Sequence, residues 1–227
     1  MAKTFSFNKK LGMALVAILL IIAELFGGKT LVSLASNNLA KALVGDGIFL
    51  TVFLVLIWMY RDILKADWKL YRQHIWRNLF LALLALIITK LVLDAVRWEI
   101  SQMGMAVNSG IIMPASVSVN NIQIISSLTP FLAPFSEEIV FRGTLFYQWT
   151  NSKVLGLIMF IISSIAFGLA HWNNFGGQII LMVPYMFMGA FYAFIYWRSN
   201  NIWHSIMAHI LFDFPPVIMS IYTLLTI

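Results

Sequence analysis

Long stretches of apolar residues constrain this chain more than any other feature of its sequence. Most of them can cross a hydrocarbon core, which takes about 20 helical residues. They occupy residues 11–26, 42–60, 78–98, 122–149, 154–171, 178–197 and 202–227. With 61% hydrophobic and 11% charged residues, the chain has too little polar surface for a water-soluble globule. The sequence therefore predicts an all-α, polytopic transmembrane helix bundle of about seven spans.

The apolar runs reach along the whole sequence and leave no stretch for a separate soluble unit. We therefore expect one membrane domain over residues 1–227. Cysteine is absent, which excludes disulfides, thiolate-bound zinc and a cysteine nucleophile. The net charge of +6 comes from Lys and Arg residues placed between apolar blocks, where they meet anionic lipid head groups. The expected partner of this charge is the lipid bilayer, and nucleic acid is not expected to bind.

The basic residues also predict an orientation, because Lys and Arg are retained on the cytoplasmic side of short loops. With the N-terminus inside, three basic residues fall on outer segments, namely Lys29, Lys41 and Arg97. Ten fall on cytoplasmic segments: Lys3, Lys9, Lys10, Arg61, Lys65, Lys69, Arg72, Arg77, Lys153 and Arg198. An odd number of spans then places the C-terminus outside. We expect an integral protein of a bacterial cytoplasmic membrane with this orientation.

Two adjacent acids in the fourth block give the strongest chemical signal. An ionisable side chain at the centre of a membrane costs about 3 kcal/mol unless it is paired or hydrated. Glu138 and Arg142 are four residues apart on the expected helix, so they share a face and can form an ion pair. Glu137 points about 100° away and can face a cavity as a general base. Both glutamates could be structural, but one arginine cannot fully satisfy two buried acids.

Two histidines in later blocks are candidate partners for these acids. His171 ends a Phe-Gly-Leu-Ala-His run, and His209 precedes Asp213 by four residues, so the last two share a helix face. An imidazole paired with a carboxylate suits proton transfer, oxyanion stabilisation or metal ligation. A single histidine near a helix end is more often interfacial. Glu24 and Asp46 lie near predicted membrane boundaries and are interpreted as structural.

Three motifs in order give the sequence a family resemblance. They are EEIVFR at 137–142, FGLAH at 167–171 and HILFD at 209–213. They resemble the CAAX protease and bacteriocin-processing family of intramembrane peptidases, also called the abortive-infection family. That family is marked by two glutamates and an arginine, then Phe with His four later, then His with Asn or Asp four later. The resemblance covers roughly residues 128–214, which we expect to form the peptidase core of the membrane domain.

The resemblance implies catalytic roles for four residues and a supporting role for two more. Glu137 and His171 would activate the attacking water. His209 and Asp213 would stabilise the oxyanion or position that water. Many family members carry Asn where this chain has Asp213, and ionised Asp cannot donate a hydrogen bond, so Asp213 could instead orient a cationic His209. The residues that would brace the site are Glu138 and Arg142.

A divalent metal is an alternative cofactor, since carboxylate and imidazole are ordinary zinc ligands. The candidate zinc ligands are Glu137, His171, His209 and Asp213. The sequence contains no HExxH helix, and the resemblance does not require a metal. The sequence leaves metal dependence open.

The function hypothesis is hydrolysis of a peptide bond within the bilayer, with a water activated by glutamate. The substrate would be a membrane-associated peptide or protein, and processing of a bacteriocin or pheromone leader, or self-immunity, is favoured. One alternative is a non-catalytic immunity or scaffold membrane protein. Another is a small proton-coupled transporter, because intramembrane acids and histidines also serve proton relays. The sequence does not identify the scissile bond or the oligomeric state.

Overall fold

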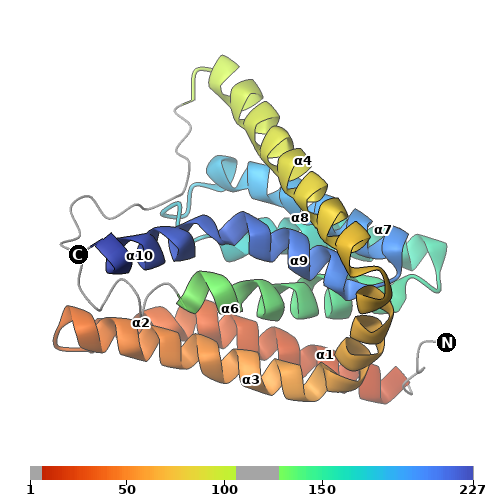
Figure 1. Cartoon of the computed structure of the whole chain (residues 1–227), viewed down its shortest axis with the longest axis horizontal. Helices are drawn as coiled ribbons and strands as arrows, with labels where there is room; N and C mark the ends of the chain where they lie inside the picture. Colours follow the sequence, from red (N-terminus) through yellow and green to blue (C-terminus); the bar gives the residue numbers. More distant parts are fainter. Residues whose placement is uncertain (1–6, 106–127, 227) are drawn as a thin grey trace.

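The computed structural model describes residues 7–105 and 128–226, and every regular element in these ranges is helical (Figure 1). The helices are α1 (Phe7–Ile22), η1 (Ala23–Gly27), α2 (Gly28–Ser33), α3 (Asn38–Tyr71), η2 (Arg72–His74), α4 (Ile75–Gln102), α6 (Leu128–Glu137), η3 (Glu138–Phe146), η4 (Tyr147–Trp149), α7 (Lys153–Ala170), α8 (Ile179–Ser199), α9 (Ile202–Asp213) and α10 (Pro215–Thr226). The predicted all-α fold is confirmed. The beginning of the expected fourth block, 122–127, lies outside the described residues.

Within the described ranges, four helical stretches are long and apolar enough to cross a membrane: Leu11–Ser33, Asn38–Gln102, Lys153–Ala170 and Ile179–Ser199. The second of them, at 65 residues, contains two of the expected blocks, because α3 and α4 are joined by the single turn η2. The expected fourth and seventh blocks are interrupted. The former consists of α6, η3 and η4, and the latter of α9 and α10. The chain is thus an all-α membrane bundle, and the expected blocks are mostly helical over their described residues.

The outward faces of the bundle are apolar, as a protein dissolved in lipid requires. Large hydrophobic side chains lie exposed along the helices, including Leu19 at 63%, Trp58 at 66% and Leu157 at 62% exposure. A water-soluble monomer rarely exposes contiguous apolar surface on this scale. Polar side chains that bear on function lie inside, and Glu138, Arg142 and His209 are almost completely buried.

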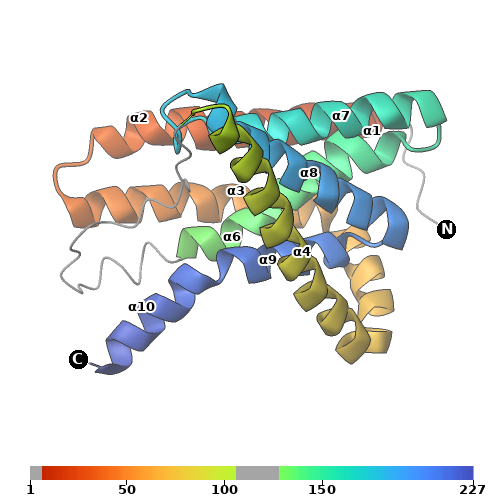
Figure 2. The ribbon, with the colours of Figure 1, turned by 90° about the horizontal axis from the view of Figure 1, so that it is seen from above.

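The helices pack around α6 and η3, which lie in the middle of the described sequence. α6 packs against α3 and α9, and η3 packs against α1 and α7. α4 crosses the others steeply in both views and covers α8 and α9 (Figures 1 and 2). The start of α1 and the end of α10 lie at opposite ends of the bundle in both views. The segment that carries the two adjacent glutamates is therefore central.

Polar residues define where the helices begin and end. Asn37 caps α3 by accepting a hydrogen bond from the Ala40 amide at 2.9 Å, and Ser152 caps α7 through the Leu155 amide at 3.3 Å. α8 ends at Asn200, whose φ of 50° is left-handed, a conformation that asparagine tolerates better than most residues. These residues fix where α3 and α7 begin and where α8 ends.

α7 and α8 approach closely because each helix places a glycine against the other helix. A Cβ placed on Gly168 would meet the Met186 side chain and, at 3.0 Å, the Met182 carbonyl oxygen. A Cβ on Gly189 would lie 3.0 Å from the Ser164 carbonyl oxygen. Small residues allow membrane helices to pack backbone to backbone. The glycine of the FGLAH motif thus serves packing and brings the end of α7 toward the centre.

The fourth block departs from the α-helix that the sequence predicts. Pro134 lies inside α6, and from Glu138 to Phe146 the chain winds as a π-helix. Proline removes a backbone donor, and the wider winding is a known response of helices to such disruption and is frequent at functional sites. Side chains of neighbouring helices bind the segment: Ser163 donates to the Phe141 carbonyl at 2.6 Å. The winding changes from α to π between the two adjacent glutamates.

Candidate active site

The structure brings together acids and a histidine from two separate parts of the chain. Glu137 ends α6, Glu138 begins η3, and His209 and Asp213 lie on α9. Glu138 and His209 are almost completely buried, whereas the Glu137 side chain is 13% exposed and that of Asp213 is 25% exposed. The cluster therefore has a closed side, formed by Glu138, and a more open side, where Glu137 and Asp213 lie.

On the closed side, Glu138 connects α9 to the buried arginine. His209 Nδ1 donates to Glu138 Oε1 at 2.9 Å, and Arg142 Nε lies 3.3 Å from Glu138 Oε2. The ion pair predicted between Glu138 and Arg142 is present although this segment is π-helical. One carboxylate thus faces two potential cations, and it fixes the orientation of the His209 ring.

On the open side, the second ring nitrogen of His209 faces the other two acids. His209 Nε2 lies 3.7 Å from Glu137 Oε2 and 3.5 Å from Asp213 Oδ2. Both separations are longer than an ordinary hydrogen bond, and a small molecule such as water can bridge groups at this spacing. The arrangement places two carboxylates and one imidazole nitrogen around a common point.

His171 lies in the same region, and the ring of Phe167 lies between it and His209. It follows the last residue of α7, and its Nδ1 lies 3.0 Å from the Phe167 carbonyl oxygen. A carbonyl only accepts, so Nδ1 donates and the neutral ring keeps Nε2 as an acceptor. The Phe167 ring lies 5.1 Å from the His171 ring and 5.6 Å from the His209 ring, measured between centroids. The two histidines therefore flank one phenylalanine.

Aromatic side chains surround Arg142. Phe167 belongs to the FGLAH motif, whereas the sequence did not identify Tyr192. The Arg142 guanidinium carbon lies 3.9 Å from the centroid of the Phe167 ring and 5.5 Å from that of Tyr192. The Tyr192 ring in turn lies 5.1 Å from the His209 ring. Such cation–π contacts stabilise a cation that is removed from water. A sequence rich in aromatic residues offers no signal that singles out Tyr192.

α9 is held in place at its N-terminus by the C-terminal half of α3. Asp67 accepts a hydrogen bond from the Ile202 amide at 3.0 Å, and Trp203 Nε1 donates to the Leu64 carbonyl at 2.9 Å. A carboxylate at a helix N-terminus also interacts favourably with the helix dipole. These contacts fix the axial position of the helix that carries His209.

The donors fit a metal in chemical type but not in their present arrangement. Among the described residues, no group of three or more His, Asp or Glu side chains lies close enough together to hold a metal ion. The nearest approximation is the set of Glu137, His209 and Asp213, in which His209 Nε2 faces both carboxylates. Metal dependence stays the open alternative that the sequence leaves, and the mechanism below is derived from the protein's own groups.

Comparison with known proteins gives a family match over the same part of the chain. Residues 120–215 match the family model described as type II CAAX prenyl endopeptidase Rce1-like. The chain is 36% identical over 101 residues to a Bacillus subtilis protein named "Putative membrane peptidase YdiL", which covers 43% of this chain and 36% of that protein. It is 33% identical over 78 residues to UPF0177 protein YxdF of Lactococcus lactis, or 34% of this chain and 40% of that protein. No solved structure matches.

The matched stretches cover less than half of the length of each of these relatives. A second Lactococcus lactis protein, UPF0177 protein YaiH, is 35% identical over 94 residues, and only 36% of its length is covered. The chain therefore matches between about a third and two fifths of the length of these relatives. The family model spans all three motifs. Residues 120–215 thus match a type II CAAX prenyl endopeptidase Rce1-like domain, in the same part of the chain whose motifs resemble the CAAX protease and bacteriocin-processing family.

Proposed function

We propose that the protein is an intramembrane endopeptidase that hydrolyses a peptide bond of a membrane-associated peptide or protein. The observation that carries the proposal is the convergence of Glu137 and Asp213 on the free nitrogen of His209, at 3.7 and 3.5 Å. Acids and an imidazole in a partly open cluster suit general acid–base catalysis. The match to a family described as endopeptidase supports the same reaction.

Glu137 is the general base of the proposed reaction. It is the more open of the two adjacent glutamates, whereas Glu138 is occupied by His209 and Arg142. Glu137 removes a proton from water as the water oxygen attacks the carbonyl carbon of the scissile bond. When the carbon–nitrogen bond breaks, the same proton passes to the leaving amine. His171, with Nε2 as an acceptor, helps to hold the attacking water.

His209 stabilises the negative charge that develops on the substrate oxygen. As an imidazolium it donates from both ring nitrogens, with Nδ1 directed to Glu138 and Nε2 directed to the open side. Asp213 helps to orient the ring and balances its charge. Arg142 and Glu138 act behind His209 and keep the ring fixed. No covalent intermediate forms in this scheme, since the chain has no cysteine and a water is the nucleophile.

The proposed substrate is a precursor peptide or protein tail that partitions into the bilayer. Leader processing of a bacteriocin or pheromone, or self-immunity, is the favoured biological role. The proposed orientation has the N-terminus in the cytoplasm and the C-terminus outside, from the excess of Lys and Arg in the expected cytoplasmic segments. It would be tested by fusing reporters to the two ends.

The variant Glu137→Gln tests the reaction. It keeps the size of the side chain and removes the base, so we expect cleavage of membrane-associated precursor peptides to fall below detection while the protein stays folded. New peptide termini would be measured by mass spectrometry. Glu99→Gln is the matched control, because Glu99 is an exposed acid near the end of α4.

The outcomes also separate the alternative functions. Undiminished cleavage by Glu137→Gln would end the proposal. Undiminished protection of cells, without any cleavage by the wild type, would favour a non-catalytic immunity or scaffold protein. Proton flux in liposomes that depends on Glu137 would favour a transporter.

A further inference from the structure

Glu24 is a buried acid that the proposed mechanism does not use. It lies in η1, a π-helical turn that separates α1 from α2, and only 3% of the residue is exposed. Neither of its carboxylate oxygens has a hydrogen-bond partner within the described residues. The nearby Lys29 donates to Asn173 Oδ1 at 3.4 Å. A buried carboxyl group without a partner is costly in a membrane protein, and π-helical turns recur at functional sites.

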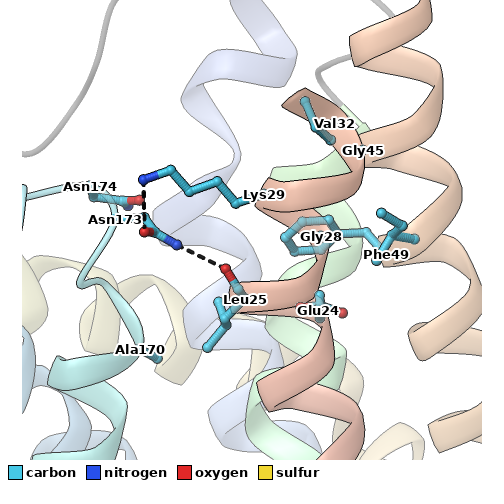
Figure 3. Close-up of a pocket in the computed structure, with 11 residues that line it drawn as sticks. Glu24, Leu25, Gly28, Lys29, Val32, Gly45, Phe49, Ala170, Asn173 and Asn174 are labelled. Carbon is cyan, nitrogen blue, oxygen red and sulfur yellow. Dashed lines mark hydrogen bonds between the residues drawn. The ribbon is translucent and has the colours of Figure 1, made fainter. Parts of the chain in front are cut away.

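Glu24 borders a cavity of about 240 Å³ that lies between η1 and α2, the first half of α3 and the end of α7 with the loop after it (Figure 3). At about 30 Å³ per water, this volume accommodates roughly eight water molecules. It is smaller than the pockets that bind drug-sized ligands. Polar residues, namely Lys29, Asn173 and Asn174, lie along it beside apolar ones. The size and the lining suit a small group of waters better than a peptide segment.

The cavity is adjacent to His171. Ala170, which precedes this histidine, and Asn173 and Asn174, which follow it, all line the cavity. Asn173 Nδ2 also donates to the Leu25 carbonyl at 2.8 Å, which ties the loop after His171 to the π-helical turn (Figure 3). The cavity wall therefore includes residues one to three positions along the chain from His171, the histidine proposed to hold the attacking water.

Glu24 also follows a helix that packs beside the proposed base. α1 packs against η3, which begins next to Glu137, and α1 continues directly into η1, which carries Glu24. Glu24 thus borders the cavity and lies in the turn that connects it to the helix beside Glu137.

We propose that this cavity supplies water to the hydrolytic site, and that Glu24 is a positioning residue that keeps water hydrogen-bonded between the cavity and Glu137. The proposal rests on the proposed peptidase function for the role of the water. The existence of an aqueous path to Ala170 can be tested without any substrate. Glu24 itself undergoes no covalent change.

The absence of cysteine allows a direct test of water access, because a single introduced thiol is the only reactive one. Ala170→Cys places the thiol on the cavity wall, and Ile165→Cys places it on the exposed apolar face of the same helix. In membranes, we expect a charged thiosulfonate to modify Ala170→Cys and to leave Ile165→Cys unmodified. A membrane-permeant maleimide should reach both. If the charged reagent does not react at Ala170→Cys, there is no aqueous path.

Two glycines on α3 provide a matched pair for filling the cavity. Gly45 lines it, and a Cβ there would lie 3.7 Å from a Val32 methyl group, whereas a Cβ on Gly47 meets nothing within 4 Å. We expect Gly45→Leu to slow modification of Ala170→Cys about tenfold by displacing water. Gly47→Leu should leave the rate unchanged. Equal rates in the two variants would overturn the role of this cavity.

Substitutions of Glu24 distinguish a role in catalysis from a purely structural role, because we expect them to change stability and activity in opposite directions. Glu24→Leu removes an unpartnered carboxyl group and should raise the Tm, yet we expect kcat for peptide hydrolysis to fall about tenfold with KM unchanged. Glu24→Gln, which still binds water, should retain most of the activity. Asp46→Asn is the control, since Asp46 is a buried acid that already accepts a hydrogen bond from Thr129 at 2.6 Å.

The results distinguish this inference from the proposed function. Wild-type kcat in Glu24→Leu would overturn the role of Glu24 even if the peptidase activity stands. A wild-type protein that cleaves no peptide, but admits the charged reagent to Ala170→Cys, would overturn the peptidase function and keep the aqueous path.

Discussion

Glu138 accepts a hydrogen bond from Nδ1 of His209, which lies 71 residues further along the chain, at 2.9 Å. The same carboxylate lies against Arg142, so a single acid organises both the histidine and the arginine of the site. Glu137, its neighbour in sequence, is left on the open side. The different surroundings of these two acids explain why adjacent glutamates have different roles in the proposed reaction.

Glu138→Gln tests this orienting role. The amide keeps the size of the side chain but loses the charge that holds the His209 ring, so we expect kcat to fall about 10- to 100-fold, as for residues that orient a functional histidine elsewhere. KM should change little, because Glu138 is buried and does not contact substrate. Steady-state kinetics on a cleaved peptide would measure the two constants. A kcat equal to that of the wild type would show that Arg142 and packing alone hold His209.

Arg142→Met tests the stability of the buried ion pair. Arg142 is completely buried, and its removal leaves Glu138 as a buried charge opposed only by His209. Breaking one partner of a buried pair destabilises proteins by about 3–5 kcal/mol. We therefore expect a clear fall in Tm, measured in detergent. The double variant Arg142→Met with Glu138→Gln should recover part of this loss, and no recovery would mean that the two residues are not energetically coupled.

The all-α fold and the acid–arginine pair could be predicted from sequence because they depend on local rules. Long apolar runs indicate that the helices lie in a membrane. Residues four apart on one helix are in contact independently of how the rest of the chain packs. The contact between Glu138 and His209 could not be predicted in this way, since it depends on how α6, η3 and α9 pack. The π-helical winding from Glu138 also has no simple sequence signal apart from Pro134.

Glu24 is another residue whose surroundings could not be predicted from the sequence. Its position near a predicted membrane boundary suggested a structural acid, because sequence alone does not reveal which neighbours a side chain has. In the structure, no hydrogen-bond partner for its carboxyl group is found among the described residues, and the residue borders a cavity. The rings of Phe167 and Tyr192 both lie near the Arg142 guanidinium, and the sequence likewise does not reveal these contacts.

Gly168→Ala tests why the FGLAH motif contains glycine. The new Cβ would meet the Met186 side chain and the Met182 carbonyl, so α7 and α8 must separate. Overpacking of this kind costs about 1–3 kcal/mol, which should lower the Tm. It should also lower kcat, because His171 lies three residues further along the chain. Gly12→Ala is the control, as nothing lies within 4 Å of a Cβ there, and equal stability of the two variants would contradict the packing role.

Removal of metal tests the cofactor. In the described residues the acids and histidines do not form a group that could hold a metal ion, and His209 Nδ1 is already engaged by Glu138. We expect hydrolysis to continue at an unchanged rate after treatment with 1,10-phenanthroline. Loss of activity that is restored by added Zn²⁺ would instead assign a metal to the open side of the cluster, with the groups moving together to bind it.

Asp213→Asn separates the two roles open to this residue. Asp213 Oδ2 lies 3.5 Å from His209 Nε2, and an ionised carboxylate can orient and balance a cationic imidazole but cannot donate to an oxyanion. Asparagine loses the charge and gains a donor. Because many family members carry Asn here, we expect Asp213→Asn to retain hydrolysis within about tenfold of wild type, whereas Asp213→Leu, which can neither donate nor accept, should lose about 100-fold. Peptide cleavage rates of the two variants, measured at equal concentrations of folded protein, distinguish the two roles of Asp213. If Asn is as inactive as Leu, the negative charge beside His209 is required, and His209 must act as a cation that Asp213 holds in place.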